Sequence, residues 1–122
     1  MSDIYRELVI DHYKHPRNFG KIEDATLSGK EDNVVCGDTV TFYLKLENDK
    51  VSSVLWNGEG CALSQASASL LSEKVKGKTL TELEAISEHD ILAIVGANLN
   101  PSRKKCAILS VEALHTTITK KV

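Results

Sequence analysis

Hydrophobic and polar residues alternate most clearly along residues 39–46. The apolar side chains that fall on one face of this segment are Val40, Phe42, Leu44 and Leu46. A period of two residues predicts a β-strand with one buried face. The polar residues 47–50 predict a hairpin turn, and residues 51–57 predict the returning strand. Residues 25–30, in an otherwise polar segment, are compatible with one more short strand.

Apolar residues recur at helical spacing in the other segments, and residues typical of helix ends flank them. Pro16 ends the first predicted helix, and Gly77 ends the second. The third begins with the spacing of a capping box, and Asn100-Pro101 marks the start of the last. The predicted helices span residues 3–15, 61–76, 79–86, 87–95 and 101–118.

Composition narrows the class of protein. A chain of 122 residues with 42% hydrophobic and 26% charged residues predicts one soluble globular domain over residues 1–122. The net charge of -2 and an aromatic content of 5% argue against a nucleic-acid-binding surface. No apolar segment is long enough to span a membrane, and the amino terminus lacks an apolar signal region, so we expect a cytoplasmic protein.

Three cysteines, in three different segments, are the strongest candidates for chemistry. Cys61 follows Cys36 by 25 positions, and Cys106 follows Cys61 by 45. Three thiolates leave one corner of a tetrahedral site for another ligand, and the Asp38 carboxylate, close to Cys36, is suited to it. Thiolate-rich sites select zinc, copper(I) or iron–sulfur clusters. Such wide spacing favours a working site assembled by folding over a local zinc finger.

Other interpretations stay open at this point. Unpaired cysteines are often buried core residues, and a purely structural zinc domain would use the same ligands. An odd number of cysteines makes a disulfide framework less favourable. Cys61 is placed at a predicted helix amino terminus, which favours a thiolate. The basic residues Arg103, Lys104 and Lys105 would favour a thiolate at Cys106, or would form an ordinary solvated helix face.

Four motifs, in order, resemble one known family. They are residues 4–20 with the sequence Asp11-His12-Tyr13 and His15-Pro16-Arg17-Asn18, then Cys36-Gly37-Asp38, then residues 58–69 around Gly60-Cys61, then Lys105-Cys106-Ala107. Together they resemble the iron–sulfur cluster assembly scaffolds known as IscU, SufU and the amino-terminal domain of NifU. The resemblance covers nearly the whole chain, and it makes the buried-core interpretation of the cysteines unfavourable.

The resemblance implies an α+β fold of the NifU-like type, in which helices cover a three-stranded antiparallel sheet and the site lies at one end. It implies that Cys36, Asp38, Cys61 and Cys106 hold a transient [2Fe-2S] cluster, or Zn²⁺ in the isolated protein, with Cys36 and Cys106 as candidate sulfur acceptors. The implied partners are a cysteine desulfurase, an iron donor and apo-proteins that receive the cluster. The implied role is that of a carrier and not of an enzyme.

The family has two branches, and the sequence has features of both. Lys105 stands where the IscU branch has a histidine, and residues 99–103 depart from the segment that an Hsp70-type chaperone recognises, which argues against that partner. A protonated lysine cannot bind a metal, which favours a SufU-type zinc-dependent sulfurtransferase. The insertion typical of SufU between Cys61 and Cys106 is missing. We therefore expect a scaffold, with the sulfurtransferase as the alternative.

Overall fold

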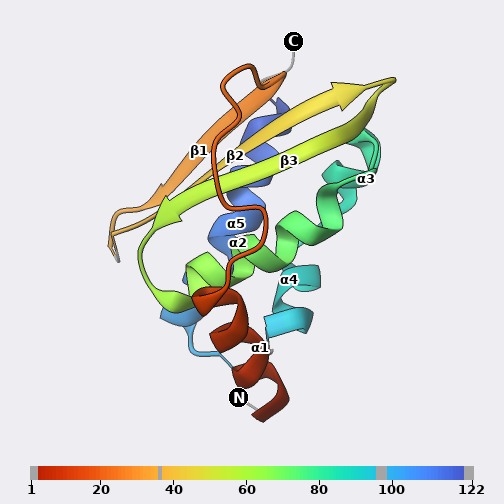
Figure 1. The fold of residues 1–122 in the computed structure, drawn as a ribbon. Helices are drawn as coiled ribbons and strands as arrows, with labels where there is room; N and C mark the ends of the chain where they lie inside the picture. Colours follow the sequence, from red (N-terminus) through yellow and green to blue (C-terminus); the bar gives the residue numbers. More distant parts are fainter. Residues whose placement is uncertain (1–2, 36, 96–98, 120–122) are drawn as a thin grey trace.

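The computed structural model describes residues 3–35, 37–95 and 99–119 of the chain. Its elements follow the predicted order, with one sheet and helices on one of its faces (Figure 1). They are α1 (Asp3–Lys14), β1 (Leu27–Asn33), β2 (Asp38–Glu47), β3 (Lys50–Glu59), α2 (Ala62–Val75), α3 (Leu80–Ala85), α4 (Glu88–Val95) and α5 (Pro101–Thr119). The protein thus has the α+β fold that the sequence predicts.

The sheet is antiparallel with the order β1-β2-β3. Val40, Phe42 and Leu44 are fully buried, which confirms the alternation predicted for β2. A β-bulge between Lys45 and Leu46 interrupts the pairing with β3, and Leu46 is only partly buried. The turn consists of Asn48 and Asp49, both with positive φ, as in a hairpin whose twist matches that of its strands.

Strand β1 departs most from the sequence-based prediction. The short strand compatible with residues 25–30 is instead Leu27–Asn33, so it begins later and extends over a run of charged and polar residues. These residues pair with β2, from Lys30 opposite Thr41 to Asn33 opposite Asp38. Backbone hydrogen bonds to a neighbouring strand, which side-chain pattern does not reveal, extend β1 to the edge of the site.

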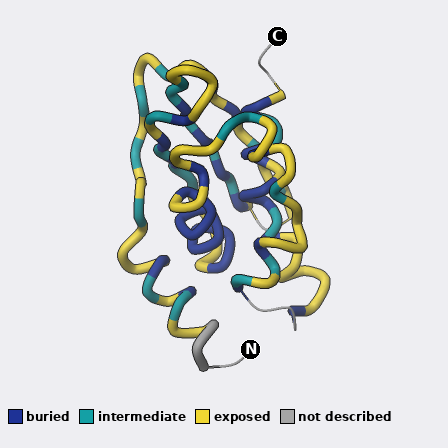
Figure 2. The backbone as a smooth tube through the Cα atoms, turned by 90° about the vertical axis from the view of Figure 1, so that its right-hand side faces the viewer, coloured by how far each residue is buried: buried dark blue, intermediate teal, exposed yellow. Residues whose placement is uncertain are grey.

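Helix α2 crosses the middle of the molecule, and Figure 2 shows this buried helix end-on. Its small side chains are all buried: Ser64, Ala66, Ser67, Ala68 and Ser69. Small residues let α2 contact the sheet on one side and α1 and α5 on others. Helix α5 also packs against β1, where the Thr117 hydroxyl donates to the carbonyl of Gly29 at 3.4 Å.

Helix α1 and the segment after it are attached to α2 and β3 by polar contacts. The Ser69 hydroxyl lies 2.8 Å from Nδ1 of His12 and accepts the Arg17 backbone N–H at 2.9 Å. The indole N–H of Trp56 donates to the Arg17 carbonyl at 2.8 Å, and Phe19 packs edge-on against the Trp56 ring. His12 and Trp56 are both buried and therefore serve packing.

Among the described residues, no helix combines the length and the apolar character that crossing a membrane requires.

We predict that Gly29→Ala destabilises the fold. A Cβ at this position would lie 2.7 Å from the backbone nitrogen and Cα of Thr117, so β1 and α5 would have to separate. Overpacking of this kind costs about 1–3 kcal/mol, measured as a lower midpoint of urea denaturation. Ser28→Ala, on the exposed side of the same strand, is the control. Equal midpoints for the two variants would contradict this account of the packing.

We also predict that the fold loses stability in mild acid through His12. Burial, followed by the charge of Arg17, lowers the pKa of His12 below its ordinary value of 6.5, against the opposing effects of Glu73 and Asp11. The unfolded chain therefore takes up this proton at a higher pH than the folded chain, and the free energy of unfolding falls as the pH drops through 6.5. A His12→Asn variant should show a flatter dependence of that free energy on pH between about 7.5 and 5.5. An unchanged slope would rule out this residue as the cause.

Candidate metal centre

Asp38 is the first residue of β2, and its side chain is fully buried. Its Oδ1 accepts the backbone N–H of Cys61 at 2.7 Å, and its Oδ2 lies 3.5 Å from the Cys61 sulfur, whose thiol donates to it. The five ion pairs among the described residues all join other groups, so no cationic side chain there pairs with this carboxylate. A buried carboxylate of this kind is suited to a bound cation.

Cys61 is the amino-terminal cap of α2, one residue before the helix proper begins. Its backbone is extended, and its sulfur accepts the N–H of Ser64 at 3.4 Å. The preceding Gly60 has a φ of +134°, and a Cβ there would overlap the Asp38 carboxylate. Glycine is therefore required for the chain to pass this close to Asp38 and to present an exposed Cys61 thiol.

Cys106 lies in the second turn of α5 and is buried in an apolar cluster with Leu63, Ala66 and Leu99. The helix starts as the sequence indicates, since the side chain of Asn100 accepts the N–H of Arg103 at 2.9 Å. The three basic residues before Cys106 are all exposed, so they form the solvated face that was one of the two interpretations.

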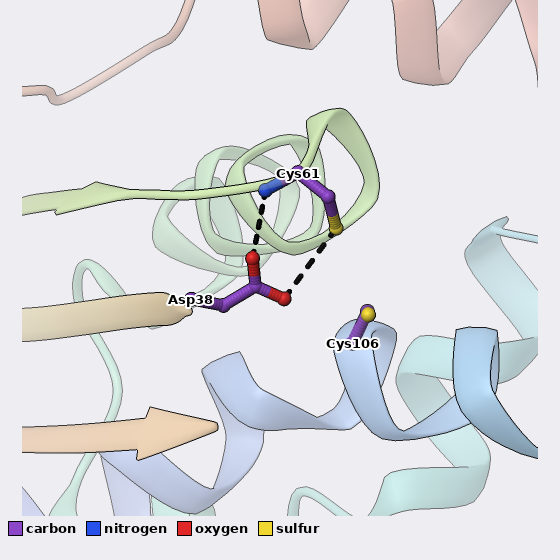
Figure 3. Close-up of side chains that lie close together, drawn as sticks. All are labelled: Asp38, Cys61 and Cys106. Atoms are coloured by element: carbon purple, nitrogen blue, oxygen red, sulfur yellow. Dashed lines mark hydrogen bonds between the residues drawn. The ribbon is translucent and has the colours of Figure 1, made fainter. Parts of the chain in front are cut away.

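The fold brings Asp38, Cys61 and Cys106 together from a strand, a helix cap and a second helix (Figure 3). Their ligand atoms all lie within 4.8 Å of one another. A tetrahedral zinc ion holds its ligand atoms about 3.5–3.8 Å apart, so shifts of roughly an ångström would close the three around one ion. Two thiolates and one carboxylate are ligands that both zinc and iron bind in proteins. The remaining predicted ligand, Cys36, lies outside the described residues.

Two polar residues beside the site escaped the sequence-based prediction. Ser64 donates from its hydroxyl to the carbonyl of Cys61 at 3.0 Å, and Gln65 donates to the Ser64 hydroxyl at 2.9 Å and to the carbonyl of Thr39 at 3.3 Å. In the sequence they belong to a row of small and polar helix residues. One signal in the sequence could have singled out Gln65, because its long amide side chain stands in a row of otherwise small side chains.

A groove of about 260 Å³ lies beside the Cys61 segment, lined by Tyr13, Phe19, Gly60 and Gln65 among others. Tyr13 and Phe19 are half exposed, as large apolar side chains seldom are. On the loop that precedes Cys36, Val34 and Val35 are even more exposed, at 87% and 89%. Large apolar side chains are therefore exposed both on the groove beside Cys61 and on the loop before Cys36.

The fold and the site define a small α+β protein in which two cysteines and a carboxylate lie close enough together to hold a metal ion. The sequence matches the NifU-like N terminal domain family over residues 4–121, and the protein belongs to this family of iron–sulfur cluster assembly scaffolds. The match confirms the resemblance that the four motifs indicate.

Relatives of both branches are similar to the chain. The zinc-dependent sulfurtransferase SufU of Bacillus subtilis is 34% identical, over 98% of this chain and 92% of its own. The scaffold protein IscU of Aquifex aeolicus is 38% identical, over 97% of this chain and 76% of its own. The alignment with SufU extends over 137 residues, more than this chain contains, so the Bacillus protein has additional residues. Identities this close do not separate the branches.

A solved structure has the same fold. The crystal structure described as a putative iron–sulfur cluster assembly scaffold protein for the SUF system, from Fervidobacterium islandicum AW-1, superimposes with a TM-score of 0.79 at 30% identity. The match covers 92% of this chain and 94% of that one.

We predict that Gly60→Ala weakens metal binding more than it weakens the fold. The new Cβ would displace the Asp38 carboxylate from the Cys61 amide, and changes around metal ligands typically cost 10–100-fold in affinity. The measurement is zinc affinity by competition with a chromophoric chelator. Gly77→Ala is the matched control, because Gly77 also has positive φ, +85°, but a Cβ there would meet nothing within 4 Å. Equal zinc affinities in the two variants would show that Asp38 does not bind the metal.

Proposed function

We propose that this protein assembles an iron–sulfur cluster on Cys36, Asp38, Cys61 and Cys106 and passes it to apo-proteins. The observation that carries the proposal is the convergence of the three described ligand atoms within 4.8 Å, in a family whose members include IscU scaffolds. The cluster is the cargo of the reaction, and we propose the [2Fe-2S] type. Zn²⁺ would occupy the same ligands in the isolated protein.

Sulfur would arrive as the outer sulfur of a persulfide on a cysteine desulfurase. A thiolate of the scaffold attacks that sulfur, a new S–S bond forms on the scaffold, and the S–S bond of the desulfurase breaks with release of its cysteine thiolate. Cys36 and Cys106 are the proposed acceptors. Burial of Cys106 favours Cys36 as the first of them. Cys61 is a third candidate, because it is exposed and because its place at a helix amino terminus favours a thiolate.

Conversion of the bound sulfur to sulfide requires electrons. Two persulfide sulfurs take up four electrons to become two sulfides, and two ferrous ions supply two of these as they become ferric. The other two come from an external one-electron carrier protein. The partners of the proposed function are therefore a cysteine desulfurase, an iron donor, this electron carrier and the apo-protein acceptors.

The geometry of Asp38 suits a cluster that must leave again. Its Oδ1 is held by the Cys61 amide, so Oδ2, which faces the Cys61 sulfur, is the oxygen available to a metal. A single carboxylate oxygen holds iron less firmly than a fourth thiolate would. The Cys61 amide would keep the carboxylate in position while the metal is bound and released.

The second candidate function is a zinc-dependent sulfurtransferase, the name of the similar Bacillus protein. The compactness of the site favours it, since ligands of one ion lie closer together than ligands of the two irons of a cluster. In that case the same four residues would hold zinc, which stabilises thiolates at neutral pH. The protein would accept sulfur by the same exchange between persulfide and thiolate, without reduction to sulfide.

One experiment separates these functions. The protein is incubated without oxygen with ferrous iron, cysteine, a reductant and a cysteine desulfurase, and its visible spectrum is recorded before and after addition of an apo-ferredoxin. We expect [2Fe-2S] bands that move to the ferredoxin and that are absent from Cys61→Ser, which lacks one thiolate ligand. Omission of the desulfurase is the control.

Two other results would each replace the proposal. A colourless protein that retains zinc and raises the turnover of the desulfurase would establish the sulfurtransferase. A protein that does neither, and whose helical circular dichroism disappears when zinc is removed, would be a structural zinc domain.

A further inference from the structure

The amide side chain of Gln65 connects the two segments that carry Asp38 and Cys61. It projects from α2 one turn after Cys61, and only 8% of the residue is exposed. Its Nε2 uses both hydrogens, one to the carbonyl of Thr39 at 3.3 Å and one to the hydroxyl of Ser64 at 2.9 Å. Thr39 is the residue directly after Asp38, and the Ser64 hydroxyl donates onward to the carbonyl of Cys61 at 3.0 Å.

The neighbouring strand leaves room for this connection. Gly58 of β3 faces Val40 in the sheet register, next to Thr39. A Cβ at Gly58 would overlap the Thr39 carbonyl oxygen and would lie 3.0 Å from Oε1 of Gln65. The absence of a side chain at Gly58 therefore permits the amide of Gln65 to reach across from α2 to β2. Gly58 and Gln65 also line the groove beside the site.

We propose that Gln65 is a positioning residue for the metal centre, which sets the separation of Asp38 from Cys61. The hydrogen bond from the Cys61 amide to Asp38 forms only if the distance between the first turn of α2 and the start of β2 is correct. Gln65 and Ser64 hold that turn to the backbone beside Asp38. Substitution of a residue that orients a metal ligand by a hydrogen bond commonly lowers metal affinity 10–100-fold. The inference rests on the metal centre proposed above.

A simpler role for Gln65 would be that of a buried amide whose hydrogen bonds are merely satisfied. That role predicts an effect of substitution on stability alone, because an unsatisfied buried partner raises the free energy of the folded state. The positioning role predicts in addition a change at the ligands. The experiment must therefore measure the site separately from the stability of the fold.

The test compares three variants of the full chain. Gln65→Met has a similar length and lacks the amide, and Ser64→Ala removes only the link from Gln65 to Cys61. Asn57→Leu is the matched control, because it removes an amide that donates to the Tyr43 hydroxyl on the other face of the sheet. The readouts are zinc affinity by chelator competition, the visible spectrum of bound cobalt(II), and amide hydrogen exchange of Cys61 without metal.

We expect Gln65→Met to bind zinc about tenfold more weakly, to shift the cobalt(II) bands, and to exchange the Cys61 amide faster than its loss of global stability accounts for. Ser64→Ala should show the same changes to a smaller extent, and Asn57→Leu none of them. Wild-type affinity, spectrum and exchange in Gln65→Met would overturn the inference. If Gln65→Met does not fold, Ser64→Ala with wild-type values in all three readouts would overturn it.

The outcome is separate from that of the proposed function. Exchange at the Cys61 amide is measured without metal, so it reports on Gln65 even if the wild-type protein assembles no cluster. Conversely, cluster assembly by the wild type together with unchanged exchange and zinc affinity in Gln65→Met would reject only the role of Gln65.

Discussion

Helix α2 is packed on three sides, against the sheet, against α1 and against α5. Its small side chains permit these close contacts, and its amino terminus therefore has little freedom relative to the rest of the fold. Cys61 caps that terminus, so the packing of α2 decides where the thiol lies. The same packing places α5, with Cys106, beside the cap. A site that joins three distant segments thus depends on one well-buried helix.

The two candidate functions use one set of ligands and differ in what the ligands do next. In either function, the hydrogen bond from the Cys61 amide would hold the Asp38 carboxylate between β2 and α2 when a metal leaves. An exposed Cys61 and a buried Cys106 give the two described thiols different access to a protein partner. Val34 and Val35, on the loop before Cys36, are exposed apolar side chains.

Side-chain pattern predicted the helices and the strands β2 and β3, because periodicity or clear end signals mark each of them. It was less successful for β1, whose polar residues are held by pairing with β2. It did not predict the bulge after Lys45, which is a property of two strands and their turn together. Ser64 and Gln65 were also missed as site residues. Their importance lies in hydrogen bonds to the carbonyls of Cys61 and Thr39, and the sequence pattern does not reveal such bonds.

The sequence by itself determined the order of elements, the family, and the candidate ligands Cys36, Asp38, Cys61 and Cys106. Periodicity and motifs are local properties of the sequence, so they can be recognised without the fold. Only the tertiary structure decided that Asp38 is buried and bonded to the Cys61 amide, that Cys106 lies within reach of both, and that Gly60 must lack a side chain. These are properties of distances between segments far apart in sequence. Such distances follow from the packing of α2 and α5 on the sheet, which no single segment specifies.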